Sequence, residues 1–167
     1  MKYMNNKRQS PPPRPKPQES LSLMREIYRA YTAELAAITD YTYAKILLEK
    51  DLPAAAELFA AIAMTEMKHY ETLGRLLHGL SAPHAPRVCL QGMPYRLLED
   101  ADSHAPVVAE QIAKDRLRDE KNAKSNYERL AKAATTERVR STLLALSADE
   151  GEHAAALEAM QSRLSGS

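Results

Sequence analysis

The stretch that decides the fold is residues 53–79, PAAAELFAAIAMTEMKHYETLGRLLHG. Apolar residues recur in it at intervals of three and four, which is the spacing of one face of an α-helix. Pro53 suits the first turn of a helix, and the pattern fades at Gly79. Glu66 and His69 interrupt the apolar face and lie about one helical turn apart. The stretch therefore predicts an amphipathic helix that carries a Glu-x-x-His motif on its buried side.

The same periodicity predicts one helix before this stretch and two after it. The first runs from Ser20 or Ser22 to about Lys50, and the very short turn before Pro53 makes the first two helices antiparallel. The third begins after Pro106 and ends near Ala131, and the fourth runs from Thr135 or Thr136 to about Met160. Met64, Met67 and Met160 are expected to fill gaps in the core.

Residues 81–106 break the helical rhythm with several prolines and a glycine, apart from a short helix expected over residues 95–101. About 25 residues can cross the length of a bundle, which a tight turn cannot do. The sequence therefore predicts an all-α fold, a four-helix bundle of two antiparallel pairs joined by a long crossover between the second and third helices.

Composition and charge restrict the remaining possibilities. Residues 1–18 hold five basic residues, five prolines and no acid, so we expect a disordered basic tail, followed by one bundle domain over residues 19–164. The net charge of the 167-residue chain is only +1, and no run of about 18 apolar residues occurs. We therefore expect a cytoplasmic protein that binds neither nucleic acid nor membrane.

Four acids fall in the middle of the four apolar stripes: Glu34, Glu66, Glu120 and Glu150. Charged residues are rarely buried unless they are paired or bind metal. A second Glu-x-x-His motif joins Glu150 to His153, so each half of the chain offers one Glu and one Glu-x-x-His. This ligand set is typical of di-iron and di-manganese bundles, since two divalent cations would neutralise the four carboxylates. The alternative is that both histidines are ordinary core residues and the acids lie on the surface.

The spacing also indicates a duplicated layout. Glu34 precedes Glu66 by 32 residues and Glu120 precedes Glu150 by 30, and a tyrosine follows the first acid of each half by seven residues. These tyrosines are Tyr41 and Tyr127, whose alternative interpretation is that of ordinary core residues.

With these motifs, residues 20–163 resemble the ferritin-like superfamily, and within it the rubrerythrin-type di-iron proteins. The resemblance implies that Glu66 and Glu150 bridge two metals, while Glu34 and Glu120 are terminal ligands. It further implies that His69 binds one metal and His153 the other, and that Tyr41 and Tyr127 hydrogen-bond ligand carboxylates across the bundle.

Two departures from that family concern the redox chemistry. The chain has a single cysteine, Cys89, whereas full-length rubrerythrins carry a rubredoxin-like iron site built from paired cysteines. The extra carboxylate near the third-helix ligand is also missing, because Leu117 and Ala123 flank Glu120 at three residues. We therefore expect a six-ligand site without a redox-linked ligand switch, supplied with electrons by an external donor protein.

The expected function is that of a di-iron peroxidase or oxidase with peroxide or dioxygen as substrate, and manganese ions are the alternative to the two iron ions. The expected catalytic set is the six ligands and the two tyrosines: Glu34, Tyr41, Glu66, His69, Glu120, Tyr127, Glu150 and His153. A homodimer is also expected. Three alternatives stay open: a bacterioferritin-type iron store, although only residues 161–167 remain for a fifth helix; manganese catalase-like dismutation of peroxide; and a metal-free interaction scaffold.

Overall fold

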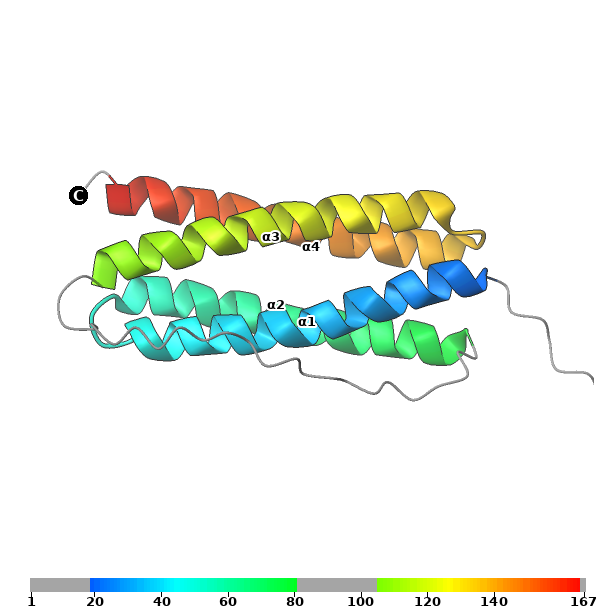
Figure 1. Cartoon of the computed structure of the whole chain (residues 1–167), viewed down its shortest axis with the longest axis horizontal. Helices are drawn as coiled ribbons and strands as arrows, with labels where there is room; N and C mark the ends of the chain where they lie inside the picture. Colours follow the sequence, from blue (N-terminus) through cyan, green and yellow to red (C-terminus); the bar gives the residue numbers. More distant parts are fainter. Residues whose placement is uncertain (1–18, 81–104, 166–167) are drawn as a thin grey trace, which may run out of the picture.

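A computed structural model describes residues 19–80 and 105–165, and within these ranges the chain forms four helices and no strand (Figure 1). The helices are α1 (Leu21–Leu48), α2 (Pro53–Gly79), α3 (Ala105–Ala133) and α4 (Glu137–Ser165). The prediction of an all-α protein with four helices is confirmed. The expected tail, the expected crossover with its short helix, and Cys89 lie outside the described residues.

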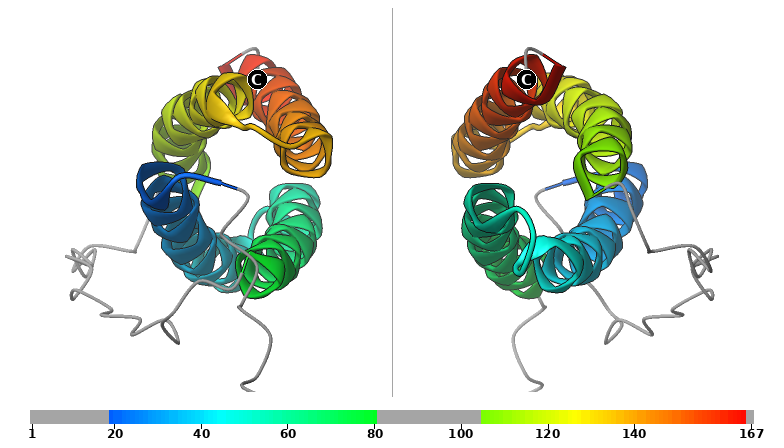
Figure 2. Two further views of the ribbon diagram at one scale, coloured as in Figure 1. Left: turned by 90° about the vertical axis from the view of Figure 1, so that its right-hand side faces the viewer. Right: turned by 90° about the vertical axis from the view of Figure 1, so that its left-hand side faces the viewer.

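The four helices surround a common centre. Figure 1 shows α1 and α2 running in opposite directions, and α3 and α4 doing the same. In the end-on views of Figure 2, α1 lies beside α2 and α3. Helix α4 lies between α2 and α3 on the other side and completes the ring. Each helix therefore turns one face toward an interior that all four line.

Local signals in the sequence explain most helix ends. The hydroxyl of Ser20 accepts a hydrogen bond from the backbone N–H of Leu23 (3.1 Å), so Ser20 rather than Ser22 caps α1. Pro53 is the first residue of α2, as expected. Helix α3 begins one residue before Pro106, and α4 continues past Met160 to Ser165. Such differences of a few residues are usual at helix ends, where apolar periodicity is a weak guide.

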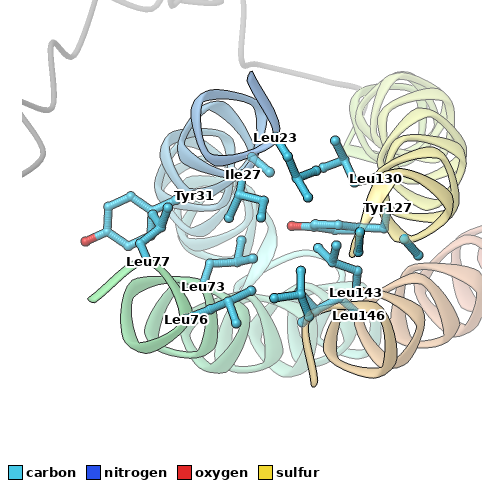
Figure 3. Packing of buried hydrophobic residues seen from close by; sticks show 14 residues of the cluster. Leu23, Ile27, Tyr31, Leu73, Leu76, Leu77, Tyr127, Leu130, Leu143 and Leu146 are labelled. Atoms are coloured by element: carbon cyan, nitrogen blue, oxygen red, sulfur yellow. The ribbon is translucent and has the colours of Figure 1, made fainter. Parts of the chain in front are cut away.

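The apolar core forms two clusters, one toward each end of the bundle. The cluster drawn in Figure 3 includes Ile27, Leu73 and Leu143, none of which is exposed to solvent. The other cluster includes Phe59 and Leu157, which are equally buried. Burial of such large apolar side chains, worth about 25 cal/mol per Å² of apolar surface, is the main contribution that stabilises the bundle. Between the two clusters, the interior holds charged side chains.

The expectation that three methionines fill the core is wrong for two of them. Met160 is buried, but Met64 and Met67 are 64% and 53% exposed. The reason is helical geometry: successive residues are about 100° apart, so with Glu66 facing the centre its neighbours at these positions face outward.

The first described residue, Glu19, ties the start of α1 to the start of α4. Its carboxylate accepts hydrogen bonds from the backbone N–H groups of Thr135 (2.9 Å) and Thr136 (2.7 Å) and from the Thr136 hydroxyl (2.7 Å). The side chain of Glu19 therefore satisfies the N–H groups of the two residues that directly precede α4. Burial opposes ionisation of Glu19, but these hydrogen bonds outweigh it and lower its pKa.

We predict that Glu19→Ala lowers the free energy of unfolding by about 1–2 kcal/mol at pH 7, because the part-buried N–H groups of Thr135 and Thr136 lose their hydrogen-bond acceptor. Because the folded-state pKa of Glu19 is lowered, its contribution is present above the ordinary pKa of 4.5 and is lost as the pH falls below it. Urea denaturation at pH 7 and at pH 3 measures both effects. The matched control is Glu57→Ala, which removes an exposed acid of α2. Equal losses for the two variants, or a loss that persists undiminished at pH 3, would contradict the assigned role.

Candidate metal centre

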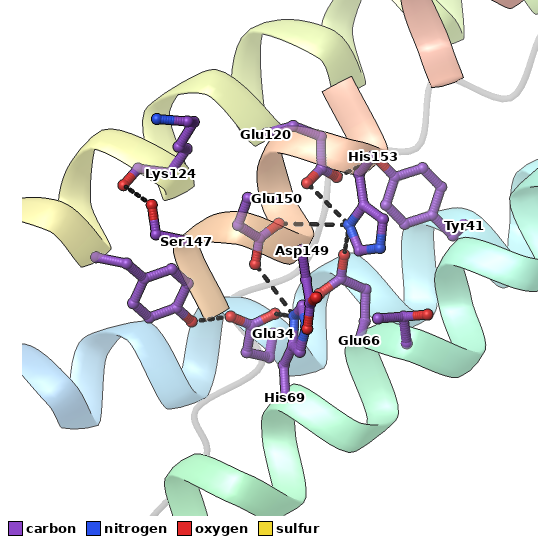
Figure 4. A network of polar contacts seen from close by, with 12 residues as sticks. Glu34, Tyr41, Glu66, His69, Glu120, Lys124, Ser147, Asp149, Glu150 and His153 are labelled. Carbon is purple, nitrogen blue, oxygen red and sulfur yellow. Dashed lines mark hydrogen bonds and ion pairs between the residues drawn. The ribbon is translucent and has the colours of Figure 1, made fainter. Parts of the chain in front are cut away.

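Six ionisable side chains meet at the centre of the bundle (Figure 4). They come from all four helices and are at most 7% exposed: Glu34 from α1, Glu66 and His69 from α2, Glu120 from α3, and Glu150 and His153 from α4. The sequence prediction that these acids and histidines face inward is therefore confirmed, and the alternative of acids on the surface is wrong.

The two Glu-x-x-His motifs face each other across the α2–α4 contact. Nδ1 of His69 lies 3.1 Å from an oxygen of Glu66 and 3.1 Å from an oxygen of Glu150. Nδ1 of His153 lies 3.0 Å from the other oxygen of Glu66 and 3.4 Å from the other oxygen of Glu150. A three-residue step places both members of a motif on one face of a helix, so each imidazole points at the acids of both motifs.

The six side chains form two overlapping groups, and within each group one donor atom from every residue lies within 4.8 Å of the donor atoms of the others. One group consists of Glu34, Glu66, His69 and Glu150; the other consists of Glu66, Glu120, Glu150 and His153. Glu66 and Glu150 belong to both groups, whereas each of the remaining four side chains belongs to one. Each group could hold a metal ion, and two ions would share the two common carboxylates.

Two carboxylate oxygens of the centre make no hydrogen bond among the described residues. Oε1 of Glu66 and Oε1 of Glu150 are buried and have no hydrogen-bond partner among the described residues, although each lies about 3 Å from a histidine Nδ1. Buried polar atoms without a partner are rare and call for an explanation. Carboxylate oxygens and imidazole nitrogens are suitable ligands for iron or manganese, and a cation here would satisfy both oxygens.

The two tyrosines connect the α1 and α3 acids across the bundle. The hydroxyl of Tyr41 donates a hydrogen bond to Oε1 of Glu120, and that of Tyr127 donates to Oε1 of Glu34. Both rings are at most 1% exposed and also belong to the apolar core, where Tyr41 lies 5.9 Å from Phe59 between ring centres. The cross-bundle hydrogen bonds that the family resemblance implies are thus present.

The pKa values of the four carboxylates are shifted in opposite directions, two upward and two downward. Burial, reinforced by a hydrogen bond with Glu66, raises the pKa of Glu34 to about 10. Burial also raises the pKa of Glu120 to about 8, against the opposing contact with His153. For Glu66 and Glu150, burial is outweighed by contacts with the two histidines, and the pKa is lowered. Two carboxylates are therefore neutral and two ionised near pH 7 in the metal-free protein.

The histidines balance the two ionised acids. Burial alone would lower the pKa of His69, but its contacts with Glu150 and Glu66 raise it to about 10. The same competition raises the pKa of His153 to about 12. Near pH 7, these pKa values give each of the four groups one proton that a bound metal would displace, and the charges of the metal-free centre balance.

Sequence reasoning missed Asp149, whose Oδ2 lies 3.1 Å from Nε2 of His69. This residue was overlooked because its side chain is 48% exposed and lies outside the apolar stripe of α4. A signal existed, because a metal-binding histidine usually donates its second N–H to a carboxylate, and Asp149 directly precedes Glu150.

The other three histidines do not belong to the centre as the structure describes it. His78 lies exposed at the end of α2, whereas His84 and His104 fall outside the described residues.

Comparison of the chain with family models, with curated proteins and with solved structures finds no match. Among the described residues, no helix is long and apolar enough to cross a membrane. Fold and site together define the class of protein: an all-α four-helix bundle with a buried centre of four glutamates and two histidines that could hold metal ions.

Proposed function

We propose that the chain is a di-iron oxidoreductase of the ferritin-like, rubrerythrin type that acts on peroxide or dioxygen. The observation that carries the proposal is the pair of four-residue ligand groups that share Glu66 and Glu150. The two residues common to both groups are those that the family resemblance assigns to bridging positions. The four residues that belong to a single group are those that it assigns to one metal each.

The arrangement of the helices supports the ferritin-like topology. Helices α2 and α3 run in the same direction in Figure 1, so α2 ends and α3 begins at opposite ends of the bundle. A connection between these ends has to span the bundle, as the long crossover of an antiparallel ferritin-like bundle does. The tyrosine of each half donates a hydrogen bond to the glutamate of the other half, between α1 and α3, so the two halves have matching contacts.

The protein residues would hold the metals and control access of water and protons. Glu66 and Glu150 would set the spacing between two ions, with Glu34 and His69 on one side and Glu120 and His153 on the other. The Tyr127 and Tyr41 hydroxyls orient the terminal carboxylates through the hydrogen bonds described above. The apolar clusters on both sides keep bulk water from the centre.

Two iron ions would supply one electron each, which together make the two-electron step that reduction of peroxide to water requires. The electrons would be replenished by a separate donor protein, and two protons are consumed for each peroxide. Manganese in the same ligands would instead support dismutation without a reductant.

The proposal is tested by loading the full chain with Fe²⁺ and measuring consumption of peroxide and of dioxygen with and without a chemical reductant. We expect turnover that depends on the reductant, and its loss in Glu66→Gln. The matched control is Glu57→Gln, which alters an exposed acid on the same helix and should keep full activity. Consumption by the manganese-loaded protein without reductant would favour the dismutase alternative, and no consumption of either substrate would refute the proposal.

A further inference from the structure

The two halves of the centre correspond closely. The matching pairs are Glu34 with Glu120, Tyr41 with Tyr127, Glu66 with Glu150, and His69 with His153. Their contacts match as well: each tyrosine hydrogen-bonds the terminal acid of the other half, and each Nδ1 faces both shared glutamates. Two metals in such a site would have nearly equivalent ligands.

The symmetry breaks at the second nitrogen of the histidines. Nε2 of His69 lies 3.1 Å from Oδ2 of Asp149, the residue before Glu150. The matching position, before Glu66, is Thr65, whose hydroxyl donates to the backbone carbonyl of Ala61 in its own helix (3.3 Å). Among the described residues, no carboxylate contacts Nε2 of His153.

A carboxylate at the second nitrogen changes the imidazole as a ligand. It fixes the ring orientation and the tautomer, so that Nδ1 presents its lone pair to the metal, and it makes the ring more basic. Loss of such a partner typically reduces metal affinity by about 10- to 100-fold. Figure 4 shows Asp149 beside His69, and the Asp149 side chain is 48% exposed and belongs to neither four-residue ligand group.

We propose, on the basis of the di-metal function above, that the two metal positions are inequivalent and fill in order: the position of Glu34 and His69 first, and that of Glu120 and His153 second. Asp149 is the positioning residue that sets this order, and Thr65 is the reason that the second position lacks the same support. The chain therefore passes through a defined state with one metal at His69 when metal is limiting.

The order of filling is tested by locating one equivalent of Mn²⁺. Crystals of the full chain prepared with one Mn²⁺ per chain are examined by anomalous diffraction, which gives the occupancy of each position separately. We expect the His69 position to hold the ion in at least about 10-fold excess over the His153 position. Location is needed because binding of a first cation weakens binding of a second even in a symmetric site.

Two variants distinguish positioning by Asp149 from a structural role. Asp149→Asn removes the charge but keeps the shape, and should reduce the preference for the His69 position by about 10-fold or more. The exchange Thr65→Asp with Asp149→Thr moves the carboxylate to the other half and should reverse the preference. Neither side chain belongs to the buried core, so thermal melting of the metal-free variants should match that of the parent.

The outcomes separate this inference from the proposed function. Two ions bound at saturation, with equal occupancy at one equivalent, would overturn the order of filling and leave the di-metal site intact. An unchanged preference in both variants would overturn the role of Asp149. Absence of metal from both positions at saturation, with Mn²⁺ and with Fe²⁺, would overturn the proposed function and, with it, the inference.

Discussion

Saturating the metal-free protein with Mn²⁺ is expected to raise its melting temperature by on the order of 10 °C. A ligand that binds only the folded state stabilises it by about 2.7 kcal/mol at 100 times its dissociation constant and about 4.1 kcal/mol at 1,000 times. A domain of 150–250 residues gains about 2–4 °C per kcal/mol, and two sites act together. The physical reason is that the ligands come together only in the folded chain, so the free energy of metal binding adds to the free energy of folding.

Thermal melting by circular dichroism, with and without metal, measures this shift. The matched control is Glu66→Gln with Glu150→Gln, which keeps side-chain volume but removes both shared carboxylates, and we expect it to show no metal-dependent shift. A parent protein that melts at the same temperature in both conditions would favour the metal-free scaffold. Equal shifts in the parent and the double variant would place the binding elsewhere.

The second large effect is on pH dependence, because binding of two metals has to displace the four protons of the metal-free centre. These protons are on His69 and His153, and on Glu34 and Glu120, whose pKa values all lie above neutral. We therefore predict release of about four protons per two metals near pH 7, and metal affinity that rises steeply with pH. Calorimetric titration in buffers of different ionisation enthalpy gives the number of protons. Release of fewer than two would contradict the protonation described above.

The stability of the metal-free protein should show the opposite trend. A group whose folded-state pKa is raised stabilises the fold below its ordinary pKa and loses that contribution as the pH rises toward the folded-state value. For the two raised acids the loss begins above about 4.5, and for the two histidines above about 6.5. As the pH is raised from 6 to 9, the denaturant concentration at the midpoint of unfolding should therefore decrease for the metal-free chain. For the metal-loaded chain it should not decrease.

Most of the fold could be predicted from the sequence because helical periodicity and helix-end signals are local. Ser20 and Pro53 mark helix starts by their own chemistry, whatever the rest of the chain does. The role of Glu19 could not be predicted in this way, because its partners Thr135 and Thr136 are more than 115 residues away in the sequence. Met64 and Met67 misled the prediction since an apolar side chain is not itself evidence of burial.

The ligand set was also accessible from the sequence, because a charged residue in an apolar stripe contradicts the pattern around it. Glu34 and Glu120 could be predicted for this reason, and the two Glu-x-x-His motifs identified His69 and His153 as candidate ligands. Asp149 lies outside the apolar stripe, so this pattern does not single it out, and its place beside Glu150 gains meaning once the structure brings it against His69. Which carboxylates are shared likewise depends on packing among four helices, which no local pattern contains.

The central claim is that the buried carboxylates and histidines hold a pair of metal ions. Elemental analysis of the full chain, purified without added metal, tests it most directly when Glu66→Ala with Glu150→Ala is purified in parallel. We predict two metal ions per chain in the parent and none in the folded double variant, because both four-residue groups lose two ligands. A metal-free parent, or equal metal content in parent and variant, would contradict the account.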